Sequence, residues 1–128
     1  MPNFEGIITD FVLGDDIDIE RSISSIPSGQ SISKAWLTIK KRYSDPDSQA
    51  VVQKIVTSVD SPSNGQITDI GASGIATMIF HLSSSNTVQF SAFAEYYYDI
   101  QLLTDANKIY TPETGVVIAF PSVTSSTS

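Results

Sequence analysis

The amino-acid sequence predicts an all-β protein, an antiparallel β-sandwich of about seven or eight short strands. Three observations lead to this fold class. Apolar and polar residues alternate in several segments, and Gly, Pro, Asn and Asp separate these segments at nearly regular intervals. No segment shows the period of about 3.6 residues that is typical of an amphipathic helix. The length of 128 residues fits one domain, and we expect the sandwich to span residues 15–121.

The first half of this domain contains two predicted strands joined by a polar turn. In residues 34–41, one face of the strand carries the alternating apolar side chains Ala35, Leu37 and Ile39. Residues 42–48 form the turn around Pro46, because proline has no N–H for a sheet ladder and the adjacent Asp side chains can bond their own backbone. A second strand is expected over residues 49–58.

The middle of the domain continues this pattern of strands and turns. Asn64 and Gly65 tolerate the positive φ of a tight reversal, and a short strand follows over residues 66–70. Gly71 to Gly74 is predicted to be a turn, because it lacks the Lys and the following helix of a phosphate-binding loop. Residues 76–82 alternate as a core strand. Residues 83–86 form either one helical turn or a simple crossover.

The second half carries the strongest strand pattern. In residues 95–104 one face is formed by Tyr96, Tyr98, Ile100 and Leu102. After a turn at residues 105–107, a strand begins at residue 108, is interrupted over residues 112–115 and continues to Phe120. The proline within this run indicates an edge strand or a bulge.

The two ends differ from this middle. Residues 1–14 are either the lead-in and first strand or an arm that docks on a partner, and they contain the apolar cluster Phe4, Ile7, Ile8, Phe11, Val12 and Leu13. Residues 122–128 consist almost entirely of Ser and Thr, which predicts a solvated tail, or an arm held by a neighbouring subunit.

Composition excludes several classes of function. With 14 acidic and 7 basic residues the net charge is −7, so most of the surface repels a phosphate backbone and no nucleic-acid partner is expected. The absence of cysteine excludes disulfides, thiolate metal sites and a cysteine nucleophile. The apolar runs are too short for a membrane span, and a reducing cytoplasm is the expected site of synthesis.

We expect no catalytic activity, no cofactor and no metal. His81 is the only histidine and lies in an alternating strand, where a surface or hydrogen-bonded strand residue is favoured over a general base. No Ser-His-acid triad is recognisable around it. Closely spaced carboxylates can hold a hard cation such as calcium, but the acidic series lacks the Gly and the distal Glu of an EF-hand loop. Acids on an exposed strand face are favoured for Asp15, Asp16, Asp18 and Glu20.

A single basic patch interrupts the acidic composition. It comprises Lys40, Lys41 and Arg42, with Lys34 nearby, and is either a solvated strand end or the complement of an acidic patch on a neighbouring subunit. Together with the apolar cluster at the start of the chain, it defines the candidate partner-contact residues Phe4, Ile7, Ile8, Phe11, Val12, Lys40, Lys41, Arg42 and Tyr43.

Three segments resemble a known family: AWLTIKKRYSDPDSQAVVQKIVT, GQITDIGASGIATMIFHL and YYYDIQLLTDANKIYTPETGVVIAF. They are similar to the Ig-like β-sandwich module of tailed-bacteriophage structural proteins, which occurs as the N-terminal domain of upper-baseplate proteins and as small stand-alone virion proteins. The similarity covers residues 15–123. The "YYYDIQ" strand, followed by a turn and the "YTPE-G" strand, is its most particular part.

The resemblance implies a non-catalytic virion component without a cofactor, made in the bacterial host cytoplasm. Its expected partners are other virion proteins and copies of itself in a symmetric assembly, with no small-molecule substrate. Baseplate members continue into a further domain, whereas this sequence ends at Ser128. We therefore expect a tail, neck or baseplate accessory subunit, with a capsid decoration protein as the alternative.

A carbohydrate- or ligand-binding sandwich is the alternative from another class of protein. Tyr43, Trp36 and Tyr97 could stack on a sugar ring. The same aromatic side chains could equally cover a sheet face or pack beneath a loop, since aromatic residues favour β-surfaces.

Overall fold

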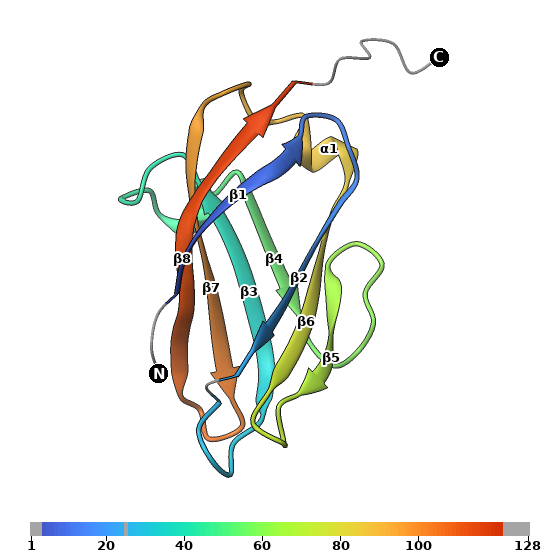
Figure 1. Ribbon diagram of the computed structural model, residues 1–128, viewed down its shortest axis with the longest axis vertical. Coiled ribbons are helices and arrows are strands. Elements are labelled where there is room, and N and C mark those ends of the chain that lie inside the picture. The colour runs from blue at the N-terminus through green and yellow to red at the C-terminus, as the bar shows by residue number, and fades with distance from the viewer. Residues whose placement is uncertain (1–3, 25, 122–128) are drawn as a thin grey trace.

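The computed structural model describes residues 4–24 and 26–121, which form two packed β-sheets (Figure 1). The strands of this described part are β1 (Phe4–Val12), β2 (Ile17–Ile23), β3 (Ile32–Lys40), β4 (Val52–Val56), β5 (Gly65–Ile70), β6 (Ala76–Leu82), β7 (Glu95–Thr104) and β8 (Ile109–Phe120). A 3-10 turn, η1 (Asp47–Gln49), and a short helix, α1 (Ser84–Thr87), connect strands. No helix in the described part is long and apolar enough to cross a membrane.

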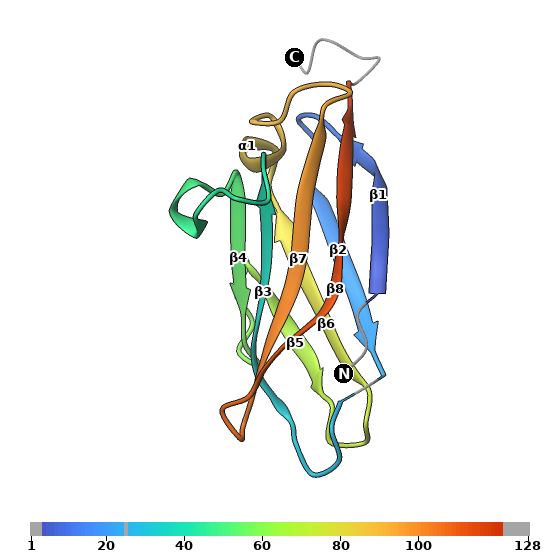
Figure 2. The same cartoon turned by 90° about the vertical axis from the view of Figure 1, so that its left-hand side faces the viewer.

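The strand order is that of an immunoglobulin sandwich. The larger sheet has five strands in the order β1-β8-β7-β3-β4, and the smaller has three in the order β2-β6-β5. Figure 2 looks onto the larger sheet, with the smaller sheet behind it. In immunoglobulin notation, β8-β7-β3 corresponds to strands G-F-C and β2-β6-β5 to strands B-E-D. Neighbouring strands are antiparallel except β1 and β8, which are parallel. The predicted Ig-like sandwich is confirmed.

The core lies between the sheets and uses the strand faces that alternation predicts. On β3, Ala35, Leu37 and Ile39 are fully buried. The inward faces of β6 and β7 are Ala76, Met78, Phe80, Leu82, Tyr96, Tyr98, Ile100 and Leu102. Alternation succeeds here because each strand has one face on the core and the other turned outward.

Two connections between strands add detail to the sequence-based predictions. The strand expected over residues 49–58 is shorter, because residues Asp47–Gln49 extend the turn as η1 and β4 begins at Val52. Of the two alternatives for residues 83–86, the helical turn is present as α1. A capping box begins it, in which the side-chain oxygen of Asn86 accepts a hydrogen bond from the backbone N–H of Ser83 at 2.9 Å.

Pro112 lies at a β-bulge, one of the two predicted alternatives. Along β7 the pairing advances two residues, from Ile100 to Leu102, while along β8 it advances three, from Tyr110 to Glu113. The extra residue on β8 lets the strand continue through Pro112, which has no N–H to donate to the ladder.

Residues Phe4–Val12 form strand β1, so the first-strand alternative describes this segment in the structure. Gly115 of β8 is paired with Gly6 of β1, and a Cβ at Gly115 would lie 2.0 Å from the carbonyl oxygen of Gly6. Only glycine permits this close approach of the two backbones. The Ser/Thr segment of residues 122–128 lies outside the described residues.

Hydrogen bonds join the connection around α1 to its surroundings. Thr87 is fully buried and donates to the backbone oxygen of Asp15 at 2.8 Å, while its hydroxyl accepts from the N–H of Gly14 at 3.0 Å. The hydroxyl of Tyr96, near the start of β7, accepts from the backbone N–H of Ser91 at 2.7 Å. Immunoglobulin sandwiches have a tyrosine corner at the same place.

We expect Tyr96→Phe to lower the free energy of unfolding by about 1 kcal/mol, because the hydrogen bond between the N–H of the exposed Ser91 and the buried Tyr96 side chain is lost. Urea denaturation of both proteins measures the difference. Tyr110→Phe makes the same chemical change at a half-buried position in β8 and is expected to change stability by less than about 0.5 kcal/mol. Equal losses in the two variants would contradict a stabilising corner.

Candidate functional site

The outer faces of the two sheets differ in chemistry. The outward residues of β2 and β6 are polar, with Ile79 as the exception: Asp18, Glu20, Ser22, Thr77 and His81. The outer side of the larger sheet instead carries exposed or half-buried apolar and aromatic side chains: Ile7, Trp36, Tyr43, Ile55, Tyr97 and Val116. Among them, Ile7 and Tyr43 are each 68% exposed. Apolar groups gathered on one exposed face are typical of an interaction surface.

Strand register arranges this face in rows. One row crosses the four strands β1, β8, β7 and β3 and ends at a basic residue of the predicted patch: Ile7, Val116, Tyr97 and Lys40. The adjacent row is polar and contains Thr114, Asp99, Thr38 and Gln53. Within it, the side-chain amide of Gln53 donates a hydrogen bond to the hydroxyl of Thr38 at 3.1 Å. The face therefore presents apolar and polar groups side by side.

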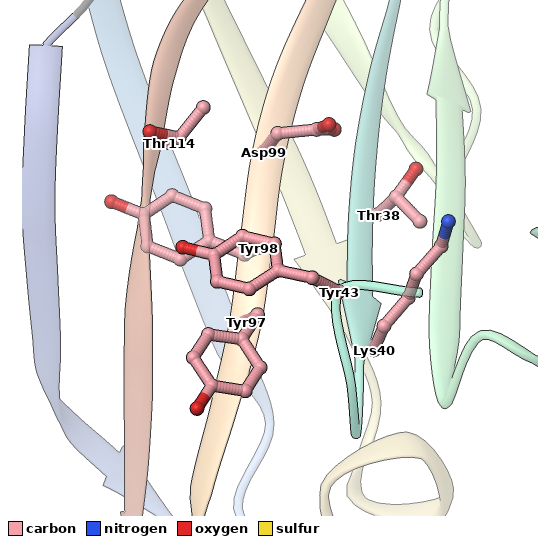
Figure 3. Close-up of a pocket in the computed structure, with 7 residues that line it drawn as sticks. All are labelled: Thr38, Lys40, Tyr43, Tyr97, Tyr98, Asp99 and Thr114. Atoms are coloured by element: carbon pink, nitrogen blue, oxygen red, sulfur yellow. The ribbon is translucent and has the colours of Figure 1, made fainter. Parts of the chain in front are cut away.

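Tyr43 comes from the loop after β3, which turns back over the sheet (Figure 3). Its ring stacks on Tyr97, with ring centroids 4.3 Å apart and planes inclined by 30°. The ammonium of Lys40 lies 2.8 Å from a carboxylate oxygen of Asp47 in the same loop. The hydrogen bond from this ammonium, and its charge, lower the pKa of Asp47. These two contacts position the loop that the sequence predicts as a polar turn.

Hollows lie on both sides of Tyr43. One is a pocket of about 70 Å³ lined by Thr38, Lys40, Tyr43, Tyr97, Tyr98, Asp99 and Thr114 (Figure 3). The other is a wider depression of about 360 Å³ over β1 and β8, lined by Gly6, Ile7, Tyr43, Thr114, Gly115 and Val116. Tyr43 and Thr114 line both hollows.

Asp99 is the carboxylate of the smaller pocket. It is half-buried, and this burial raises its pKa above the ordinary value. Lys40 acts on it only through its charge, since the salt bridge of Lys40 within the described residues is made to Asp47. Asp99 thus differs from the solvated acids elsewhere on the surface.

The candidate partner-contact residues are divided between surface and core. Tyr43, Lys41, Arg42 and Ile7 are exposed, Lys40 and Val12 are half-buried, and the side chain of Phe4 lies outside the described part. Ile8 and Phe11, however, are only 5% and 0% exposed. A register shift between them turns both toward the core, so they stabilise the protein's own fold and cannot contact a partner.

A buried polar cluster between the sheets was not predicted from the sequence. Nε of Arg21 in β2 lies 3.0 and 3.1 Å from the two carboxylate oxygens of Glu113 in β8, which is 4% exposed. The hydroxyl of Tyr98 donates to the same carboxylate. Burial and this hydrogen bond raise the pKa of Tyr98 well above its ordinary value. The sequence contains one feature from which this cluster could be predicted. Arg21 occupies an inward position of β2, where a charged side chain needs a buried partner.

The acidic series and His81 have structural contacts. Nδ1 of His81 lies 2.6 Å from a carboxylate oxygen of Asp18 on the neighbouring strand. Asp16 accepts a hydrogen bond from the backbone N–H of Ser84 at 2.7 Å, at the start of α1. Asp15 and Glu20 are exposed. Within residues 4–24 and 26–121, no three His, Asp or Glu side chains are grouped so that they could hold a metal ion.

The fold and this surface define an Ig-like β-sandwich with one apolar, aromatic outer sheet face. No protein-family model matches the chain, and no curated protein matches it in sequence. What the surface binds must therefore be inferred from its own side chains.

Proposed function

We propose that this protein is a non-catalytic structural component of a tailed-phage virion, a tail, neck or baseplate accessory subunit that contacts other subunits through the outer face of its five-stranded sheet. The resemblance of the "YYYDIQ" and "YTPE-G" strands supports the phage assignment. The asymmetry of the two outer faces supports the choice of surface, and it is the observation that carries the proposal.

The composition of this face suits a protein partner. Aromatic residues and Arg are enriched at protein–protein interfaces, and a polar rim commonly surrounds the apolar centre. Ile7, Tyr43 and Tyr97 supply apolar and aromatic contact area here, while the exposed Lys41 and Arg42 lie beside Tyr43 at the edge. The β1–β8 depression of about 360 Å³ gives a side chain of the partner a place to insert.

Carbohydrate binding is less well supported by the same geometry. Tyr43 covers one face of the Tyr97 ring, so this face cannot stack on a sugar. The pocket of about 70 Å³ is well below the roughly 300–1,000 Å³ of ordinary small-molecule sites. The depression of about 360 Å³ is large enough, but Tyr43 is the only aromatic side chain among the described residues that line it. Saturable binding of a glycan that is lost in Tyr43→Ala would overturn this conclusion.

The decisive experiment combines particle composition with a surface substitution. Mass spectrometry of purified phage particles is expected to detect the chain, and Ile7→Asp is expected to reduce its incorporation at least tenfold, because a carboxylate would be buried at the contact. Ile75→Asp is the control, in the turn between β5 and β6 where the side chain is 49% exposed. Thermal unfolding should show both variants folded.

Two outcomes would contradict the proposal. Particles without the chain would exclude a virion component, and equal incorporation of both variants would exclude the outer face of the larger sheet as the contact surface. A copy number close to that of the major capsid protein would favour a decoration protein over a tail, neck or baseplate subunit.

A further inference from the structure

The pocket beside Tyr43 contains a carboxylate that makes no salt bridge within the part of the chain that the structure describes. Asp99 is half-buried between Thr38 of β3 and Thr114 of β8, its partners across the sheet. We infer that this pocket receives a basic side chain, the guanidinium of Arg or the ammonium of Lys, from a neighbouring protein subunit. The inference rests on the proposed function and states the chemistry of the partner.

The charges around the pocket favour a cation. Two charged groups line it, the carboxylate of Asp99 and the ammonium of Lys40, and the carboxylate of Asp47 acts on Asp99 through its charge. Because Lys40 pairs with Asp47 at 2.8 Å, the charge of Asp99 remains in excess, and the three groups together carry one negative charge. The net charge of −7 on the whole chain acts in the same direction. An anionic ligand would be repelled.

The walls of the pocket suit the end of a basic side chain. Tyr43 and Tyr97 supply aromatic rings, on which a cation gains a cation–π interaction. The hydroxyls of Thr38 and Thr114 can accept hydrogen bonds on either side of Asp99. A volume of about 70 Å³ accommodates a guanidinium or ammonium group, whereas a sugar ring or a nucleotide is too large.

Among the described residues, no salt bridge offsets the burial of Asp99 in the isolated fold. Its half-burial penalises the charged carboxylate, as the raised pKa shows, and a bound cation would remove this penalty. A residue that destabilises the free protein but stabilises a complex is typical of a binding site. Asp99→Asn should therefore keep or raise the unfolding midpoint while it weakens cation binding.

The test is an NMR titration of the isotopically labelled protein with N-acetyl-arginine amide. Saturable shifts are expected at the backbone amides of Thr38, Asp99 and Thr114. The neutral citrulline analogue is expected to bind at least tenfold more weakly, and Asp99→Asn to weaken arginine binding at least tenfold. Asp60→Asn removes an exposed acid after β4 and should leave binding unchanged. Binding should also weaken as the pH falls through the pKa of Asp99, because only the ionised carboxylate attracts the cation.

Several results would overturn the inference. These are the absence of saturable shifts, shifts spread over the acidic surface, equal binding of the citrulline analogue, or equal effects of Asp99→Asn and Asp60→Asn. Particle composition separates this failure from that of the proposed function. If the chain is present in particles but does not bind arginine, the virion proposal stands and the pocket inference fails. If the chain binds arginine but is absent from particles, the pocket binds a basic group and the virion proposal fails.

Discussion

Replacing Glu113 by alanine is expected to lower the free energy of unfolding by about 3 kcal/mol. The carboxylate holds Arg21 of the smaller sheet and Tyr98 of the larger sheet, and it is 4% exposed. Its removal leaves a half-buried guanidinium without its counter-charge and a buried hydroxyl without an acceptor. Urea denaturation followed by circular dichroism measures the loss.

Glu95→Ala is the matched control, because Glu95 is exposed at the start of β7, and a change below about 0.5 kcal/mol is expected. Equal effects of the two substitutions would show that the cluster does not join the sheets. The raised pKa of Tyr98 adds a pH dependence. The unfolded chain loses the Tyr98 proton near the ordinary value of 10.0, while the folded chain retains it, so stability falls as the pH rises above that value.

Phe11→Ala is expected to lower the free energy of unfolding by about 3–5 kcal/mol. The ring of Phe11 is fully buried, and its centroid lies 4.7 Å from that of Phe90 in an edge-on contact. The smaller side chain leaves a cavity where β1 meets the connection before β7. Thermal and urea unfolding measure the loss, and hydrogen exchange of the β1 amides reports whether the strand opens more often.

Phe93→Ala makes the same change at a side chain that is 68% exposed, and we expect it to cost less than about 1 kcal/mol. If Phe11→Ala cost no more than this control, residues 4–12 would not be an integral strand in solution. The alternative of an arm that docks on a partner would then describe this segment better.

Local alternation predicted most of the individual strands. The sequence predicts a strand over residues 95–104, and β7 has the same bounds. The prediction succeeds because buried and less buried residues alternate without interruption along the whole of β7. The turns around Pro46 and Gly65 and the bulge at Pro112 depend on equally local signals. Such features depend only on residues close in sequence, so they can be recognised before any pairing is known.

The features that could not be predicted depend on pairing between strands far apart in the sequence. Ile8 and Phe11 belong to the core because of a register shift in β1, which the apolar cluster alone does not reveal. Tyr43 was singled out as an aromatic beside a turn, but Asp99 and Thr114 were not. They meet Thr38 only through the register of β8 with β7 and of β7 with β3, and strand order is not encoded in alternation.

The parallel pairing of β1 with β8 has a consequence for how the protein is made. Phe4 pairs with Glu113, so β1 gains its neighbour in the sheet only after β8 has been synthesised. Contacts so distant along the chain slow the final step of folding. The depression that separates β1 from Tyr43 is completed in the same step. If the proposed partner binds this face, it would bind only chains in which β8 is present and paired with β1.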